Sequence, residues 1–151
     1  MSIDEIIDFV TDFGDVLVLR PEAGDGTPEI AWGDTFFYFS PDGTVPPGQP
    51  FATVVTKNYP DDDRCGLDSP GAFRVNVAAD KDEFARFIGR TPREPATVPP
   101  FTGTDTVVAH PLYGSAGWLA VVNPGPATEF AVRELLESAY HRARARHERR
   151  A

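Results

Sequence analysis

Residues 72–77, AFRVNV, carry the clearest strand pattern in the chain. Successive side chains of a strand point to opposite faces of a sheet, so polar and apolar residues separate here. The apolar face of this segment holds Phe73, Val75 and Val77. The other face holds Arg74 and Asn76. The pattern predicts a sheet with one face in the core and one face turned away from it.

Four more segments predict strands, because they are short, rich in β-branched or aromatic residues and bounded by turn signals. They are residues 15–20, 35–39, 51–56 and 117–122. In TFFYF, residues 35–39, either register leaves aromatic side chains on both faces. Residues 106–109, TVVA, are a candidate for a short extra strand.

Three segments have apolar residues at helical spacing, which predicts helices over 3–13, 81–88 and about 126–146. The first two begin with capping boxes, Ser2 with Glu5 and Asp80 with Glu83. In the last helix the apolar positions run from Val132 to Ala143 in the strongest periodic pattern of the chain. Its arginine-rich end, residues 141–151, is expected to fray.

Strands joined by loops pair antiparallel more readily than parallel. We therefore predict one α+β domain over residues 1–151, with two layers. One layer is a mainly antiparallel sheet of about five strands. The other consists of the N-terminal and C-terminal helices, packed on one face of the sheet.

Composition and charge narrow the classes of function. The 151 residues carry a net charge of −9, which argues against nonspecific binding of nucleic acid. The start of the chain lacks the pattern of a signal peptide, and no apolar run reaches the length of a membrane span. We expect a cytoplasmic protein that does not bind membranes. The tail 141–151 holds five arginines and one glutamate, which suits a helix C-terminus or a basic contact arm.

Several blocks resemble an uncharacterised bacterial family of unknown function: GDTFFYF, PFATVVT, LDSPGAFRVNV, HPLYGSAGWLAVVNPG and LLESAYHRA. More distantly, the order of elements, the FRVNV strand before a helix and the tryptophan-bearing strand are similar to MmcQ/YjbR-like proteins. That resemblance implies a CyaY-like fold and, for some relatives, contact with DNA. The acidity of this chain departs from such a role. Neither resemblance supplies catalytic residues.

The densest group of polar candidates lies in residues 109–125, AHPLYGSAGWLAVVNPG. His110 could serve as a general base or ligand contact, or its ring could bond backbone groups in a loop that anchors the Trp118 strand. Trp118 is interpreted as a core residue. We select five candidate binding residues: His110, Tyr113, Asn123, Arg74 and Asn76.

Other chemistry is poorly supported. His141 and His147 do not share a helix face, and the acidic run 61–63 lacks the spacing of a calcium loop, so we expect no metal site and a solvated acidic loop. Cys65 is interpreted as an ordinary loop thiol. No phosphate-binding loop, dinucleotide fingerprint or nucleophile elbow occurs, and we expect no cofactor.

The face of the sheet away from the helices leads to three alternatives. The long loops 21–34, 40–50 and 90–105 could cover it, a second copy of the chain could form a homodimer there, or it could hold a small-molecule cleft. The sequence thus favours a non-enzymatic module that binds a small molecule or a protein partner. A DNA-contacting regulator and a small enzyme with His110 as general base are the alternatives.

Overall fold

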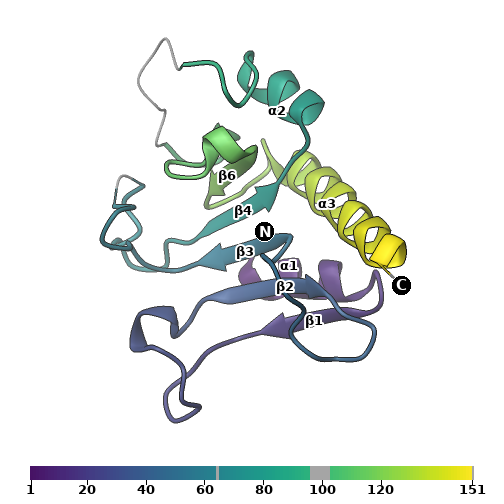
Figure 1. Cartoon of the computed structure of the whole chain (residues 1–151). Coiled ribbons are helices and arrows are strands. Elements are labelled where there is room, and N and C mark those ends of the chain that lie inside the picture. The colour runs from purple at the N-terminus through teal and green to yellow at the C-terminus, as the bar shows by residue number, and fades with distance from the viewer. Residues whose placement is uncertain (64, 96–102, 151) are drawn as a thin grey trace.

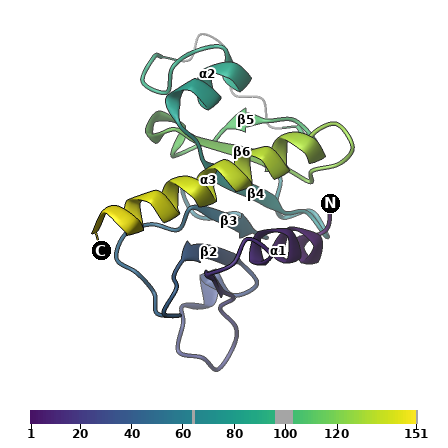
Figure 2. The same cartoon turned by 90° about the vertical axis from the view of Figure 1, so that its right-hand side faces the viewer.

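A six-stranded antiparallel sheet forms the centre of the computed structural model, which describes residues 1–63, 65–95 and 103–150. The strands lie in the order β1-β2-β3-β4-β6-β5. Figure 1 shows the run from β1 through β4 to β6, and Figure 2 shows β5 beside β6. Their bounds are Val16–Leu19 for β1, Thr35–Phe39 for β2, Ala52–Val55 for β3, Arg74–Ala78 for β4, Val108–Ala109 for β5 and Trp118–Val122 for β6. The predicted α+β architecture with an antiparallel sheet is confirmed.

The first four strands form a meander in which each strand pairs with the next one along the chain. Strand β6 then pairs with the far side of β4, with Ala78 opposite Trp118, and β5 adds an edge to β6. The candidate strand at 106–109 is therefore real but only two residues long. It makes the sheet six strands wide, one more than the five expected.

Three helices accompany the sheet: α1 over Ile3–Thr11, α2 over Lys81–Ile88 and α3 over Glu129–Arg150. Figure 2 shows α1 and α3 lying across the same face of the sheet. Both predicted capping boxes form, and Gly89 ends α2 in the left-handed conformation. Helix α1 ends at Thr11, two residues before the predicted end, and α3 is displaced by three to four residues toward the C-terminus.

The main core lies between the sheet and these helices. It takes the inward side chains of β2, β3, β4 and β6 and the apolar stripes of the three helices, for example Phe37, Val75, Leu119, Phe84 and Leu136. A second, smaller cluster lies at the other face, beneath the loop 57–71, and consists of Val55, Cys65, Leu67, Ala72 and Val122. That loop is therefore partly buried, although its composition is polar.

Candidate functional site

The face of the sheet opposite α1 and α3 bears a cleft of about 540 Å³. Its floor consists of the outward side chains of four neighbouring strands. They are Phe36 and Tyr38 on β2, Thr53 and Val55 on β3, Arg74 and Asn76 on β4, and Trp118 on β6. Register explains the grouping, since Asn76 lies directly opposite Thr53 and Arg74 directly opposite Val55.

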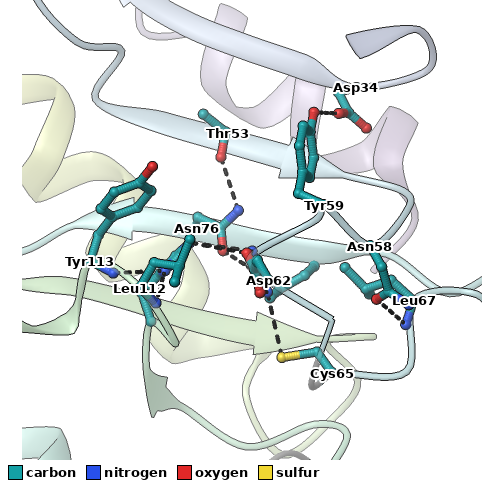
Figure 3. Close-up of polar contacts among 12 residues, drawn as sticks. Asp34, Thr53, Asn58, Tyr59, Asp62, Cys65, Leu67, Asn76, Leu112 and Tyr113 are labelled. Carbon is teal, nitrogen blue, oxygen red and sulfur yellow. Dashed lines mark hydrogen bonds and ion pairs between the residues drawn. The ribbon is translucent and has the colours of Figure 1, made fainter. Parts of the chain in front are cut away.

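Loops form the walls of this cleft but do not cover it. Ala31 comes from the loop 21–34, Gln49 and Pro50 from the loop 40–50, and Leu112 and Tyr113 from the segment before β6. Figure 3 shows the rings of Tyr59 and Tyr113 on opposite sides of the polar floor. Two of the three long loops expected over this face thus border the cleft. The third, 90–105, falls partly outside the described residues, and its described part does not line the cleft.

A buried ion pair lies at the centre of the floor. Arg74 is only 1% exposed, and its guanidinium donates to both carboxylate oxygens of Asp62, at 2.8 and 2.5 Å. Its Nε donates to Oδ1 of Asn76 at 2.7 Å, and Nδ2 of Asn76 donates to the Thr53 hydroxyl at 2.9 Å. A buried charge requires a partner, and the planar fork of arginine matches a carboxylate. The centre of the floor is therefore polar yet close to neutral.

Asp62 corrects the prediction of a solvated acidic loop at 61–63. Its neighbours Asp61 and Asp63 are exposed, but Asp62 is 5% exposed and turned inward to Arg74. Tyr59 and Asp62 exchange two backbone hydrogen bonds, which turn the loop back over the sheet. Of the three adjacent aspartates, Asp62 is therefore the one that neutralises Arg74.

Cys65 lies in this loop as expected, and its thiol is buried. It is 5% exposed, belongs to the small second cluster, and its sulfur accepts from Nη1 of Arg74 at 3.4 Å. Burial alone would lower the pKa of Arg74, but the bonds to Asp62 and Cys65 outweigh burial and raise it. The guanidinium therefore stays charged, with all its N–H groups directed at protein atoms.

His110 is buried at the side of the same network. Its ring Nδ1 accepts from the backbone N–H groups of Leu112 and Tyr113, each at 3.1 Å. The backbone N–H of His110 donates to the Trp118 carbonyl at 2.9 Å. The ring thus organises the turn that leads into β6, as one interpretation of the sequence expected. Its Nε2 faces the cleft network, 3.2 Å from Nη2 of Arg74 and 4.0 Å from Oδ2 of Asp62.

The protonation state of His110 follows from these contacts. Burial and, after it, the nearby charge of Arg74 lower its pKa to about 4, although Asp62 opposes both effects. The ring is therefore neutral at pH 7. Both ring nitrogens face protein N–H groups, since Nδ1 lies against the backbone N–H groups of Leu112 and Tyr113 and Nε2 lies against Nη2 of Arg74. Neither nitrogen therefore presents a free lone pair to the cleft for a general base.

A second buried carboxylate, that of Asp34, fixes one side of the cleft. Asp34, only 1% exposed, accepts from the Tyr59 hydroxyl, from the backbone and hydroxyl of Thr56, and from Nζ of Lys57 at 3.1 Å. Burial and the bond to Asp34 raise the pKa of Tyr59, so its hydroxyl keeps its proton. These contacts fix the tyrosine ring as one wall of the cleft.

Four of the five candidate residues come together here: His110, Tyr113, Arg74 and Asn76 all line the cleft. Arg74 and Asn76 face away from the core as predicted, although both are buried. Asn123 lies elsewhere, at the end of β6, where its Oδ1 accepts the N–H of Phe73 at 3.0 Å. Its backbone is left-handed, with φ of 46°, so the structure gives it a role in a turn.

Sequence reasoning missed several residues of the cleft. Trp118 is half-buried and lines the cleft, which corrects its assignment to the core. Tyr38, Tyr59 and Asp62 were not selected at all. One signal was available, since a charged residue inside an apolar strand such as RVNV demands a buried partner of opposite charge. Within the described ranges, no group of three or more acidic, histidine or cysteine side chains could hold a metal ion.

The fold and the site define an α+β protein with one antiparallel sheet, two helices on one face and a cleft on the other. The chain belongs to DUF6194, a family of unknown function, whose pattern matches residues 1–151. No curated protein and no solved structure matches it. The more distant likeness to MmcQ/YjbR-like proteins stays a prediction. None of the described helices is long and apolar enough to cross a membrane.

Proposed function

We propose that this chain is a non-enzymatic module that binds a small molecule in the cleft on the open face of its sheet. The observation that carries the proposal is a hollow of about 540 Å³ in which aromatic side chains of the floor and walls surround a buried polar network. Small-molecule sites usually have volumes of roughly 300–1,000 Å³, mostly apolar linings and a few fixed polar groups.

The chemistry of the lining favours a ligand with a flat, apolar body. Tyr38, Tyr113 and Trp118 offer ring surfaces, and two of them end in hydroxyl groups. The charge of Arg74 is already neutralised by Asp62, so the floor gives no net cation to a ligand. Donors remain at the indole of Trp118 and at the hydroxyls of Tyr38 and Tyr113. They suit an uncharged aromatic or heteroaromatic body that carries hydrogen-bond acceptors.

The cleft is also built to keep its shape without a ligand. Its floor comes from four paired strands, and its polar side chains are held by bonds to one another. Preorganised side chains lose little conformational freedom when a ligand binds. This supports a binding site more than a loosely covered sheet face.

A fragment screen tests the proposal. Uncharged aromatic compounds with carbonyl or ring-nitrogen acceptors would be screened by thermal shift, since a ligand of the native state raises the melting temperature. Hits would be titrated into a Trp32→Phe variant, in which Trp118 is the remaining tryptophan. We expect a change of Trp118 fluorescence that saturates.

Two exposed aromatic residues give a matched control. Tyr113 is 52% exposed at the cleft, and Phe130 is 77% exposed on α3, outside its lining. Tyr113→Ala should weaken a hit by roughly tenfold, and Phe130→Ala should leave it within about twofold. Equal effects of both variants, or a library without a hit, would contradict the proposal.

The other functional classes give different results in the same samples. Turnover of a hit that stops in His110→Gln would indicate an enzyme with His110 as base. Tight, steeply salt-dependent binding of duplex DNA would favour a regulator of MmcQ/YjbR-like type. Self-association that rises with concentration in sedimentation, and that competes with fragment binding, would show that a second copy occupies the open face.

A further inference from the structure

A second hollow, of about 270 Å³, lies where the C-terminal part of α3 meets the loop 46–50. Three basic side chains of α3 line it: Arg146, His147 and Arg150. No aspartate or glutamate is among its lining residues. This is unusual in a chain with a net charge of −9, and it makes the hollow a concave basic surface on an acidic protein.

The arginines of this hollow differ in their pairing from Arg142 and Arg144 on the same helix. Arg142 donates to Glu83 at 2.8 Å, and Arg144 donates to Glu148 at 2.9 Å. Among the residues that the structure describes, Arg146 and Arg150 form no ion pair. Within the part of the chain that the structure describes, no carboxylate therefore pairs with the arginines of the hollow.

Arg146 carries the clearest sign of this imbalance. Burial, and then the like charges of Arg142, Arg150 and Arg149, lower its pKa below the usual value. A favourable interaction of cations with a helix C-terminus explains why basic residues collect there. It does not explain why two of them line a hollow that excludes carboxylates.

The opposite wall of the hollow is stiff. Pro46, Pro47 and Pro50 have fixed φ angles and no N–H groups, and Gln49 contributes a side-chain amide. A rigid wall facing two guanidinium groups favours a compact anion, because arginine pairs with phosphate and carboxylate through parallel N–H bonds.

We propose that this hollow is a binding site for an anionic group, a phosphate or a carboxylate, held by Arg146 and Arg150. Tyr38, Gln49, Pro50 and Trp118 line both this hollow and the cleft, so the two sites are neighbours. The anion can thus be free or can be part of a molecule whose apolar body lies in the cleft. Only the second source rests on the proposed function.

The test uses inorganic phosphate and pyrophosphate as probes, titrated at constant ionic strength and followed by NMR of the arginine side chains. The variant is Arg146→Gln with Arg150→Gln. The matched control is Arg144→Gln with Arg149→Gln, which removes the same charge from the same helix outside the hollow. We expect saturable binding by the native chain, a loss of at least about tenfold in the variant and a change within about twofold in the control.

Equal losses of phosphate affinity in the variant and in the control, or no saturation in the native chain, would overturn the site. The arginines would then attract anions only through the general charge of the helix end. The two sources of the anion are then separated with fragment hits from the cleft. If hits that carry a carboxylate lose affinity in Arg146→Gln with Arg150→Gln, and their uncharged analogues do not, one molecule spans both sites. Phosphate binding without any cleft ligand supports a free anion and leaves this inference standing even if the proposed function fails.

Discussion

Arg74 and Asp62, twelve positions apart in the chain, form a two-bond ion pair beneath the open face of the sheet, and both side chains are almost wholly buried. The pair links the loop 57–71 to strand β4. Both residues of the pair line the cleft, and Arg74 also donates to the sulfur of Cys65 in the second cluster. Most of the predictions below therefore concern this network and its neighbours.

Removing the carboxylate should be more harmful than its place in a polar loop indicates. Asp62→Asn leaves the guanidinium of Arg74 buried without its anion, which is expected to lower the free energy of unfolding by about 3–5 kcal/mol. Urea unfolding measures the change. Asp63→Asn is the control, because Asp63 is exposed, and its effect should stay within about 0.5 kcal/mol. Equal midpoints for both variants would show that the pair contributes nothing to stability.

His110 makes the stability depend on pH. Its pKa is about 4 in the folded chain and about 6.5 when unfolded, so the unfolded state binds the proton first as the pH falls. Stability is retained above pH 6.5 and decreases between pH 6.5 and 4, by up to about 3 kcal/mol from this group. Unfolding of the native chain and of His110→Gln across this range gives the measurement. The variant should show a shallower slope, and parallel slopes would contradict the assignment.

Cys65 should report on opening of the loop 57–71. As the only cysteine, and 5% exposed, it is expected to react with a thiol reagent far more slowly in the native chain than in urea. Asp62→Asn should accelerate labelling under native conditions, because it releases the loop that covers the thiol. Asp61→Asn, on the exposed side of the same loop, should leave the rate unchanged. Rapid labelling of the native chain would show that the loop is open in solution.

Asn123 should affect stability and not ligand binding. Asn123→Ala loses the bond to the N–H of Phe73 and places alanine in a left-handed conformation, with an expected loss of about 1–3 kcal/mol. Asn123→Asp keeps an acceptor and tolerates this backbone, so it should lose less. Affinity for fragments that bind in the cleft should be the same in both variants. A selective loss of affinity would return Asn123 to the site.

The fold was largely predictable because its signals are local. Capping boxes, the left-handed glycine after α2 and the alternation of residues 72–77 depend on neighbours a few positions away. The same alternation correctly assigned Arg74 and Asn76 to the open face. What local patterns could not supply was the partner of Arg74, because three adjacent aspartates have the same composition whether exposed or buried. Trp118 was misassigned for a related reason, since hydrophobicity alone does not say on which face of β6 it lies.

The pairing of β6 with β4 has a consequence for the order in which the molecule assembles. Strands β1 to β4 can add one after another through shorter chain closures than the one that brings β6 to β4, and this meander already holds Arg74 and Asp62. His110 and Trp118 arrive only with β6, after the chain has passed through α2 and returned to β4. Long closures are slow to form because they lose more chain entropy before contacts compensate for it. A folding intermediate that contains only β1 to β4 would have the ion pair but an incomplete cleft. During refolding, ligand binding should therefore recover later than the sheet signal.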